Sequence, residues 1–78
     1  MGTHRILVIA REPAWARNWA AKNIDAHDRM PTICGITNCR SYLLGARELL
    51  IVLVDLEPKD LGNEIYRLRN NTVMLVKE

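Results

Sequence analysis

Residues 49–55 have the sequence Leu49-Leu50-Ile51-Val52-Leu53-Val54-Asp55, and this stretch decides the fold. Its six apolar residues run without a break until an acid stops them. An unbroken aliphatic run of this length is typical of a strand that is buried on both faces, as in a parallel sheet. A second run, Ile6–Ala10, has the same character. We therefore expect these two strands to lie side by side at the centre of one sheet.

Two weaker strand patterns, Met30–Ile36 and Thr72–Val76, come later in the chain. Pro31 suits the first residue of a strand or an edge strand, because it has no N–H to donate. Gly35 weakens the first pattern further and indicates a bulge. We expect both segments at the edges of the sheet, which gives the strand order 2-1-3-4.

Helical patterns separate the strands, at Pro13–Ile24, Cys39–Leu44 and Pro58–Asn70. A proline fits the first turn of a helix, and both long segments begin with one. Asn38 is a good N-cap for the short helix, and Gly45 is a natural stop after it. The pair Asn70-Asn71 can supply a left-handed turn at the end of the last helix.

The apolar positions of the two long helices form stripes. In the first helix the stripe contains Trp19, and Trp15 lies one turn before it, so we expect both indole rings in the core. In the last helix Leu61, Ile65 and Leu68 are spaced as one buried face. These faces predict helices that pack on the sheet.

The alternation of strands and helices predicts a single α/β domain over residues 1–78, a small three-layer Rossmann-like βαβαβαβ fold with a mostly parallel four-stranded sheet. The alternative is an α+β fold whose final edge strand is antiparallel. We find no internal repeat, low-complexity stretch or linker.

Composition sets broad limits on function. The 78 residues are 49% hydrophobic and carry a formal net charge of +2, with seven basic and three acidic side chains in residues 1–47 and four basic and six acidic in the rest. This uneven distribution of charge suits head-to-tail self-association, or a basic face that binds a partner. We favour the simpler interpretation that the charged side chains lie on ordinary solvent-exposed faces. No apolar run is long enough for a membrane span, and the start does not resemble a signal peptide, so we expect a cytoplasmic protein.

Ligands of open parallel sheets bind beyond the carboxyl ends of the strands, where the strand order reverses. The polar residues expected there, which are our candidate ligand-binding residues, are Arg11, Glu12, Asn38, Asp55 and Glu57.

The sequence argues against a nucleotide site of the usual kind. No glycine-rich phosphate loop follows the first strand, where the chain continues Arg11-Glu12-Pro13. Leu50–Asp55 looks like the metal-holding strand of phosphate-loop ATPases, but any buried strand that ends in Asp matches that pattern. The acids Glu12, Asp55 and Glu57 suit a divalent ion, and they equally suit helix starts, which we favour.

Residues for catalysis are not evident. His4, His27 and Ser41 have no partners suggested by their positions. Cys34 and Cys39 make half a metal site at best, and we expect one buried thiol and one incidental thiol. We predict no enzyme, no metal and no cofactor.

Nucleic-acid binding is a further alternative, through a basic face. It is not favoured, because free aromatic rings for stacking are not expected. The residues of that face would be Arg11, Arg17, Lys22, Arg40 and Arg47.

Several segments resemble a group of small uncharacterised accessory proteins of actinobacterial phages, in which a strand precedes an "ARxWA"-like helix, a "LRGxR"-like turn and a strand that ends in Asp. The matching segments are Arg5–Ala10, Ala14–Ala20, Leu43–Arg47, Leu50–Asp55 and Glu64–Leu68. Ala46 interrupts the turn pattern. The resemblance implies a Rossmann-like domain similar to phosphate-loop ATPase halves without the phosphate loop, and an accessory phage product in the host cytoplasm.

We expect a non-enzymatic protein that acts through protein–protein interaction, first with itself and otherwise with a host protein, and not with a membrane. The last strand is apolar and at an edge, and such a strand invites pairing with another chain. The expected interface residues are Thr72, Val73, Met74, Leu75 and Val76. The alternatives are a degenerate nucleotide or metal binder at the crevice, and the nucleic-acid binder.

Overall fold

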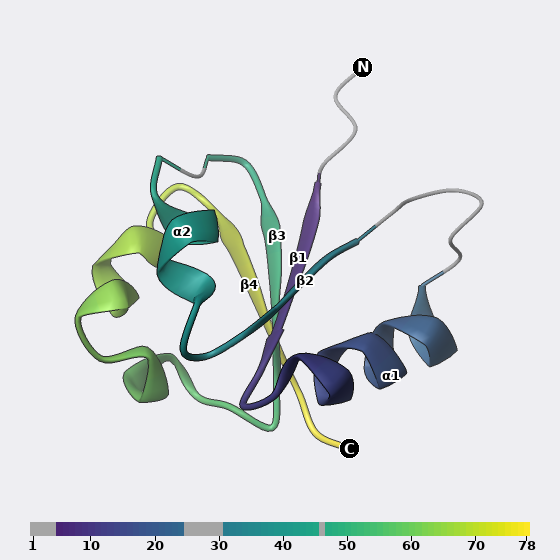
Figure 1. The fold of residues 1–78 in the computed structure, drawn as a ribbon. Helices are drawn as coiled ribbons and strands as arrows, with labels where there is room; N and C mark the ends of the chain where they lie inside the picture. The colour runs from purple at the N-terminus through teal and green to yellow at the C-terminus, as the bar shows by residue number, and fades with distance from the viewer. Residues whose placement is uncertain (1–4, 25–30, 46) are drawn as a thin grey trace.

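The computed structural model describes residues 5–24, 31–45 and 47–78. Strands alternate with helical segments along the chain (Figure 1). In order they are β1 (Ile6–Ala10), α1 (Pro13–Asn23), β2 (Thr32–Gly35), α2 (Cys39–Leu43), β3 (Leu50–Val54), η1 (Pro58–Leu68) and β4 (Thr72–Val76).

The four strands form one sheet with the order β2-β1-β3-β4, as the sequence predicts. Every pair is parallel, so the antiparallel final strand of the α+β alternative is wrong. The two continuous apolar runs are neighbours at the centre, with Val8 opposite Val52. The architecture is therefore a small Rossmann-like α/β domain.

The helical segments cover opposite faces of the sheet (Figure 1). The chain moves from β1 to β2 across α1, then reverses direction and moves to β3 and β4 across α2 and η1. Right-handed crossovers require segments that travel in opposite directions to lie on opposite faces. The reversal places α1 alone on one face and puts α2 with η1 on the other.

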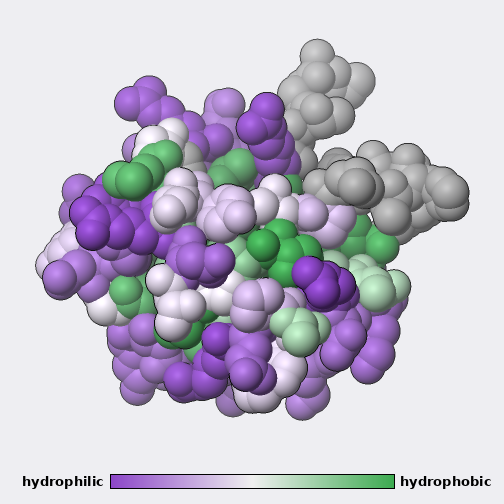
Figure 2. Space-filling model, viewed as in Figure 1, coloured by the Kyte–Doolittle hydropathy of each residue, from purple (hydrophilic) through white to green (hydrophobic). Residues whose placement is uncertain are grey.

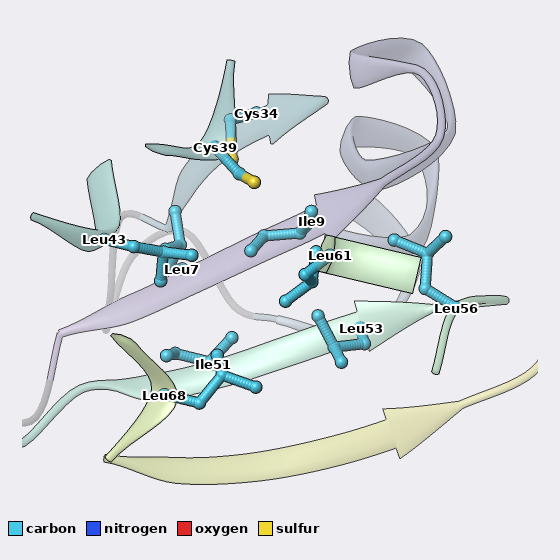
Figure 3. Close-up of a cluster of buried hydrophobic side chains, with 10 residues drawn as sticks. All are labelled: Leu7, Ile9, Cys34, Cys39, Leu43, Ile51, Leu53, Leu56, Leu61 and Leu68. Carbon is cyan, nitrogen blue, oxygen red and sulfur yellow. The ribbon is translucent and has the colours of Figure 1, made fainter. Parts of the chain in front are cut away.

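Alternate side chains of β1 and β3 enter two separate cores. Beneath α1, Val8 and Val52 pack with Ala16 and Trp19. On the other face the strand side chains pack against α2 and η1, as Figure 3 shows. The buried residues of that second core are Leu7, Ile9, Cys34, Cys39, Leu43, Ile51, Leu53, Leu56, Leu61 and Leu68.

Trp15 departs from expectation. Trp19 is buried as predicted, with 8% of its surface exposed, but Trp15 is 46% exposed. The buried stripe of α1 consists of Ala16, Trp19 and Ala20, and Trp15 lies at its margin. One turn of spacing from a buried residue is therefore not enough to bury the second ring.

The bulge expected at Gly35 is absent. Thr32 to Gly35 pair with Leu7 to Ala10 in continuous register, with no extra residue in β2. A Cβ atom at Gly35 would lie 2.8 Å from Cδ of Pro13, at the start of α1. The glycine serves the close approach of a helix to the sheet, and β2 is shorter than the predicted strand.

The last helical segment differs most from prediction. It is a 3-10 helix rather than an α-helix, and it is interrupted at Gly62, where φ is 62° and ψ is −129°. Leu61 and Leu68 are buried, but Ile65, the middle residue of the predicted stripe, is 37% exposed. The left-handed turn after it is confirmed, since Asn70 has a φ of 68°.

The short helix agrees with prediction. It covers Cys39–Leu43, one residue less than expected, and Gly45 follows it with a φ of 70°. In the described part of the chain, no helix has both the length and the apolar character needed to cross a membrane.

Replacing Gly35 by alanine should lower the free energy of unfolding by roughly 1–3 kcal/mol, the usual cost of overpacking. The proline ring that the new methyl group meets is rigid, so α1 itself must shift. Urea unfolding followed by circular dichroism measures the change. Thr32→Ala, at an exposed site in the same strand, is the matched control, and an equal loss in both variants would contradict the close-approach role.

Candidate functional site

Arg11 and Glu12 lie where β1 leads into α1. The guanidinium of Arg11 is 3.9 Å from a carboxylate oxygen of Asp60, which is in the first turn of η1. Glu12 occupies the N-cap position of α1 and its backbone carbonyl accepts the N–H of Trp15 at 3.0 Å, but its side chain forms no capping hydrogen bond. Both side chains are exposed.

Asp55 ends β3 in a left-handed conformation, with a φ of 55°. Its backbone N–H donates to the carbonyl of Val76 at 2.9 Å. Its carboxylate oxygen Oδ1 accepts the backbone N–H of Glu78 at 3.0 Å. Asp55 therefore extends the pairing of β3 with β4 beyond the last residue of the sheet.

Glu57 and Asp60 form the capping box that begins η1. Asp60 Oδ2 accepts the backbone N–H of Glu57 at 2.8 Å, and the backbone N–H of Asp60 donates to the Glu57 carbonyl at 2.9 Å. Glu57 also lies 3.1 Å from the ammonium group of Lys59. The pair satisfies backbone donors that the start of a helix leaves open.

Asn38 precedes α2, but its side chain does not cap that helix. Its Oδ1 instead accepts the backbone N–H of Gly35 at 2.9 Å, which closes the turn after β2. The predicted position is right, and the predicted capping bond is wrong. Short polar side chains favour such local bonds with the backbone.

Asp55 lines a hollow of about 300 Å³ together with Trp15, Asn18, Lys22 and Glu78. Among the residues that the structure describes, no group of three or more acids, cysteines or histidines is placed to hold a metal ion. The polar contacts of the five candidates favour roles in helix starts and turns. Ligand binding at this crevice stays a prediction, and His4 and His27 lie outside the described residues.

The cysteines correct another expectation, because both thiols are buried and free. They lie together in the core beneath α2 (Figure 3). Cys39 Sγ lies 3.4 Å from the carbonyl oxygen of Ile36, to which it donates. Burial, and then the neighbouring Cys39, raise the pKa of Cys34 to about 12. Burial and the charge of Glu64 raise the pKa of Cys39 as well.

The basic residues expected on one face are divided between two. Arg17 and Lys22 are in α1 and Arg40 is in α2, on opposite faces of the sheet, while Arg11 forms its ion pair with Asp60 of η1. A different group gathers at the amino ends of the strands, where a hollow of about 450 Å³ is lined by Leu43, Gly45, Arg47, Asn63, Tyr66, Arg67, Arg69 and Asn70. Sequence reasoning missed Tyr66 and Arg69, because they fall in a predicted helix far from the carboxyl-end crevice.

The expected interface segment, β4, lies at the edge of the sheet. Met74 is 38% and Leu75 is 56% exposed, Thr72 is exposed, and Val73 and Val76 are half-buried. Large apolar side chains are therefore accessible at this edge.

Comparisons with protein-family models, with curated proteins and with solved structures found no match to this chain. The fold defines its class, a small Rossmann-like α/β domain with a fully parallel sheet. The resemblance to phage accessory proteins stays a prediction.

Replacing Asp55 by alanine should speed hydrogen exchange at the Glu78 amide, because Oδ1 is its acceptor. An exposed hydrogen bond of this kind contributes roughly 1 kcal/mol, so exchange should rise several-fold. Asp55→Asn retains Oδ1 and is the matched control. Protection of Glu78 in the alanine variant, measured by NMR, would show that the bond does not hold the strand end.

The free energy of unfolding should fall as the pH rises from about 9 towards 12. An unfolded cysteine ionises near pH 8.5, whereas the raised pKa keeps Cys34 neutral in the folded protein. The unfolded state therefore loses its proton first, and stability that is complete below pH 8.5 is lost above it. Guanidinium unfolding at pH 7.5 and 10.5 measures the loss.

Lysines and tyrosines also titrate in this range, so Cys34→Ala provides the comparison. The variant should lose less stability between the two pH values than the parent protein does. Equal losses in both proteins would show that Cys34 ionises equally well in the folded and unfolded states.

Proposed function

We propose that this protein is a non-enzymatic interaction module that forms a homodimer through the outer edge of β4. The observation that carries the proposal is an edge strand with two large exposed apolar side chains, Met74 and Leu75. An edge strand presents unpaired backbone groups to a second chain. A second copy brings the same strand with the same side chains.

The hydrogen bonds of β4 define its open side. The N–H of Thr72 donates to Leu49, and the carbonyl of Val76 accepts from Asp55, so these residues direct their backbone groups toward β3. Successive residues of a strand direct these groups to alternate sides. The N–H and C=O groups of Val73 and Leu75 consequently point away from the sheet.

If two β4 strands lie antiparallel across a two-fold axis, the outward N–H and C=O groups of one copy can pair with those of the other. With Met74 opposite Met74 of the second copy, Val73 of each copy pairs with Leu75 of the other. Both pairs are apolar, and the residues with outward backbone groups face each other. A two-fold interface of this kind is self-complementary and closed, which prevents growth into a fibre.

The other edge of the sheet is less suited to pairing. β2 has four residues against five in β4, and Pro31 directly before it has no N–H. A proline at a strand edge blocks further pairing. Within Thr72–Val76 there is neither a proline nor a charge. The contrast favours β4 as the interaction edge.

We place this dimer in the cytoplasm, since two free thiols are typical of a reducing compartment. An accessory role, as the resemblance to phage proteins implies, suits a small domain with one open sheet edge.

Replacing Leu75 by lysine should convert the dimer to a monomer. The charge of the new side chain would be brought out of water within the apolar pairing, beside Val73 of the second copy. Size-exclusion chromatography with light scattering should give twice 8.9 kDa for the parent protein and 8.9 kDa for the variant.

Leu44→Lys is the matched control, because Leu44 is 53% exposed and lies outside β4. It should leave the dimer intact. A parent protein that stays monomeric at millimolar concentration, or a dimer that persists in Leu75→Lys and dissociates in Leu44→Lys, would overturn the proposal.

A further inference from the structure

The amino-end hollow continues into a second depression, and we call the two together the arginine groove. The second depression has a volume of about 590 Å³ and is lined by Arg47, Glu48 and Asn70. Arg47 and Asn70 line both hollows, so the two are contiguous. The groove runs from the end of α2, across the start of β3, to the end of η1.

Positive charge dominates the groove. Three arginines line it, against one acid, Glu48. Arg67 forms an ion pair with Glu64, in which its Nε lies 2.7 Å from the carboxylate oxygen Oε2. In the described part of the chain, neither Arg47 nor Arg69 forms an ion pair. In Figure 2, hydrophilic side chains cover much of the visible face, including its left side, where η1 lies.

Tyr66 adds an aromatic surface to this charge. It lines the groove and is 70% exposed, the most of any large apolar or aromatic side chain in the described residues. Only four residues of the chain are Trp or Tyr, and there is no Phe. An exposed ring beside free arginines is the combination that stacks a base and neutralises its phosphates.

The shape of the groove favours a single strand over other anions. A small nucleotide usually binds in an enclosed pocket that buries most of its surface. The arginine groove instead consists of two neighbouring hollows that share Arg47 and Asn70, so it is an extended surface rather than one enclosed pocket. Duplex DNA is read by an element that protrudes into its groove, and this surface is concave. The amide side chains of Asn63 and Asn70 add donors and acceptors along the path.

We propose that the arginine groove binds single-stranded nucleic acid, with phosphates on Arg47 and Arg69 and a base stacked on Tyr66. The site lies at the amino ends of the strands, opposite to the crevice at the carboxyl ends. It uses none of the residues of β4, so it does not depend on the proposed dimer.

The test uses a fluorescein-labelled oligo(dT) of about 12 nucleotides, within the range of strand lengths that single-strand-binding sites cover. Fluorescence anisotropy measures binding to the full chain at low salt. Two phosphate contacts predict a slope of log K against log salt of about −1.4. Arg47→Ala and Arg69→Ala should each weaken binding roughly tenfold.

Tyr66 gives the more specific readout. Tyr66→Ala should weaken binding by roughly 5- to 150-fold, the usual loss for one stacked base, without changing the salt slope. Tyr66→Phe keeps the ring and should bind as the parent protein does. Arg17→Ala removes one positive charge from the exposed surface of α1 and is the matched control.

The proposal is overturned by an absence of anisotropy change at low salt. It is also overturned if Arg17→Ala weakens binding as much as Arg47→Ala, or if Tyr66→Ala binds like the parent. Equal affinity for a duplex of the same length would likewise reject a groove built for single strands. Circular dichroism of each variant confirms that the fold is retained.

Discussion

The parallel pairing of β1 with β3 is the constraint on which the rest of the structure depends. Its register, with Val8 opposite Val52, sends alternate side chains of both strands into two separate cores. A slip of one residue would exchange the two faces of a strand. Because both cores are filled from this pair, the segments on each side must supply apolar side chains, as Trp19 does from α1 and Leu61 from η1.

Continuous apolar runs made the sheet predictable. A strand buried on both faces has no polar alternation, so Ile6–Ala10 and Leu50–Val54 could be placed at the centre from sequence alone. The form of η1 could not be predicted in this way. The positions of Leu61, Ile65 and Leu68 fit an α-helix, but the structure needs only Leu61 and Leu68 in its core. The backbone break at Gly62, where φ is 62°, divides the predicted helix, and nothing in the spacing of the apolar residues indicates that break.

The candidate site illustrates a different limit. Asn38, Asp55 and Glu57 were singled out because polar groups at the ends of parallel strands often bind ligands. The same residue types are what turns, strand ends and helix starts require. Whether such a residue is available for a ligand or bonds to the protein's own backbone is decided by its contacts in the structure. For Asp55 the contact is the 3.0 Å hydrogen bond between Oδ1 and the Glu78 amide nitrogen. Sequence predicted the location of these side chains well, and their partners could not be predicted.

The break at Gly62 links the core to both surfaces that we propose. A backbone with φ of 62° and ψ of −129° is accessible to glycine and strained for other residues. After this break the chain returns Leu68 to the core and leaves Tyr66 exposed. The same segment then turns at Asn70 into β4, whose outer edge is open. The segment after Gly62 thus lines the arginine groove with Asn63, Tyr66 and Arg67 and leads directly into the interaction edge.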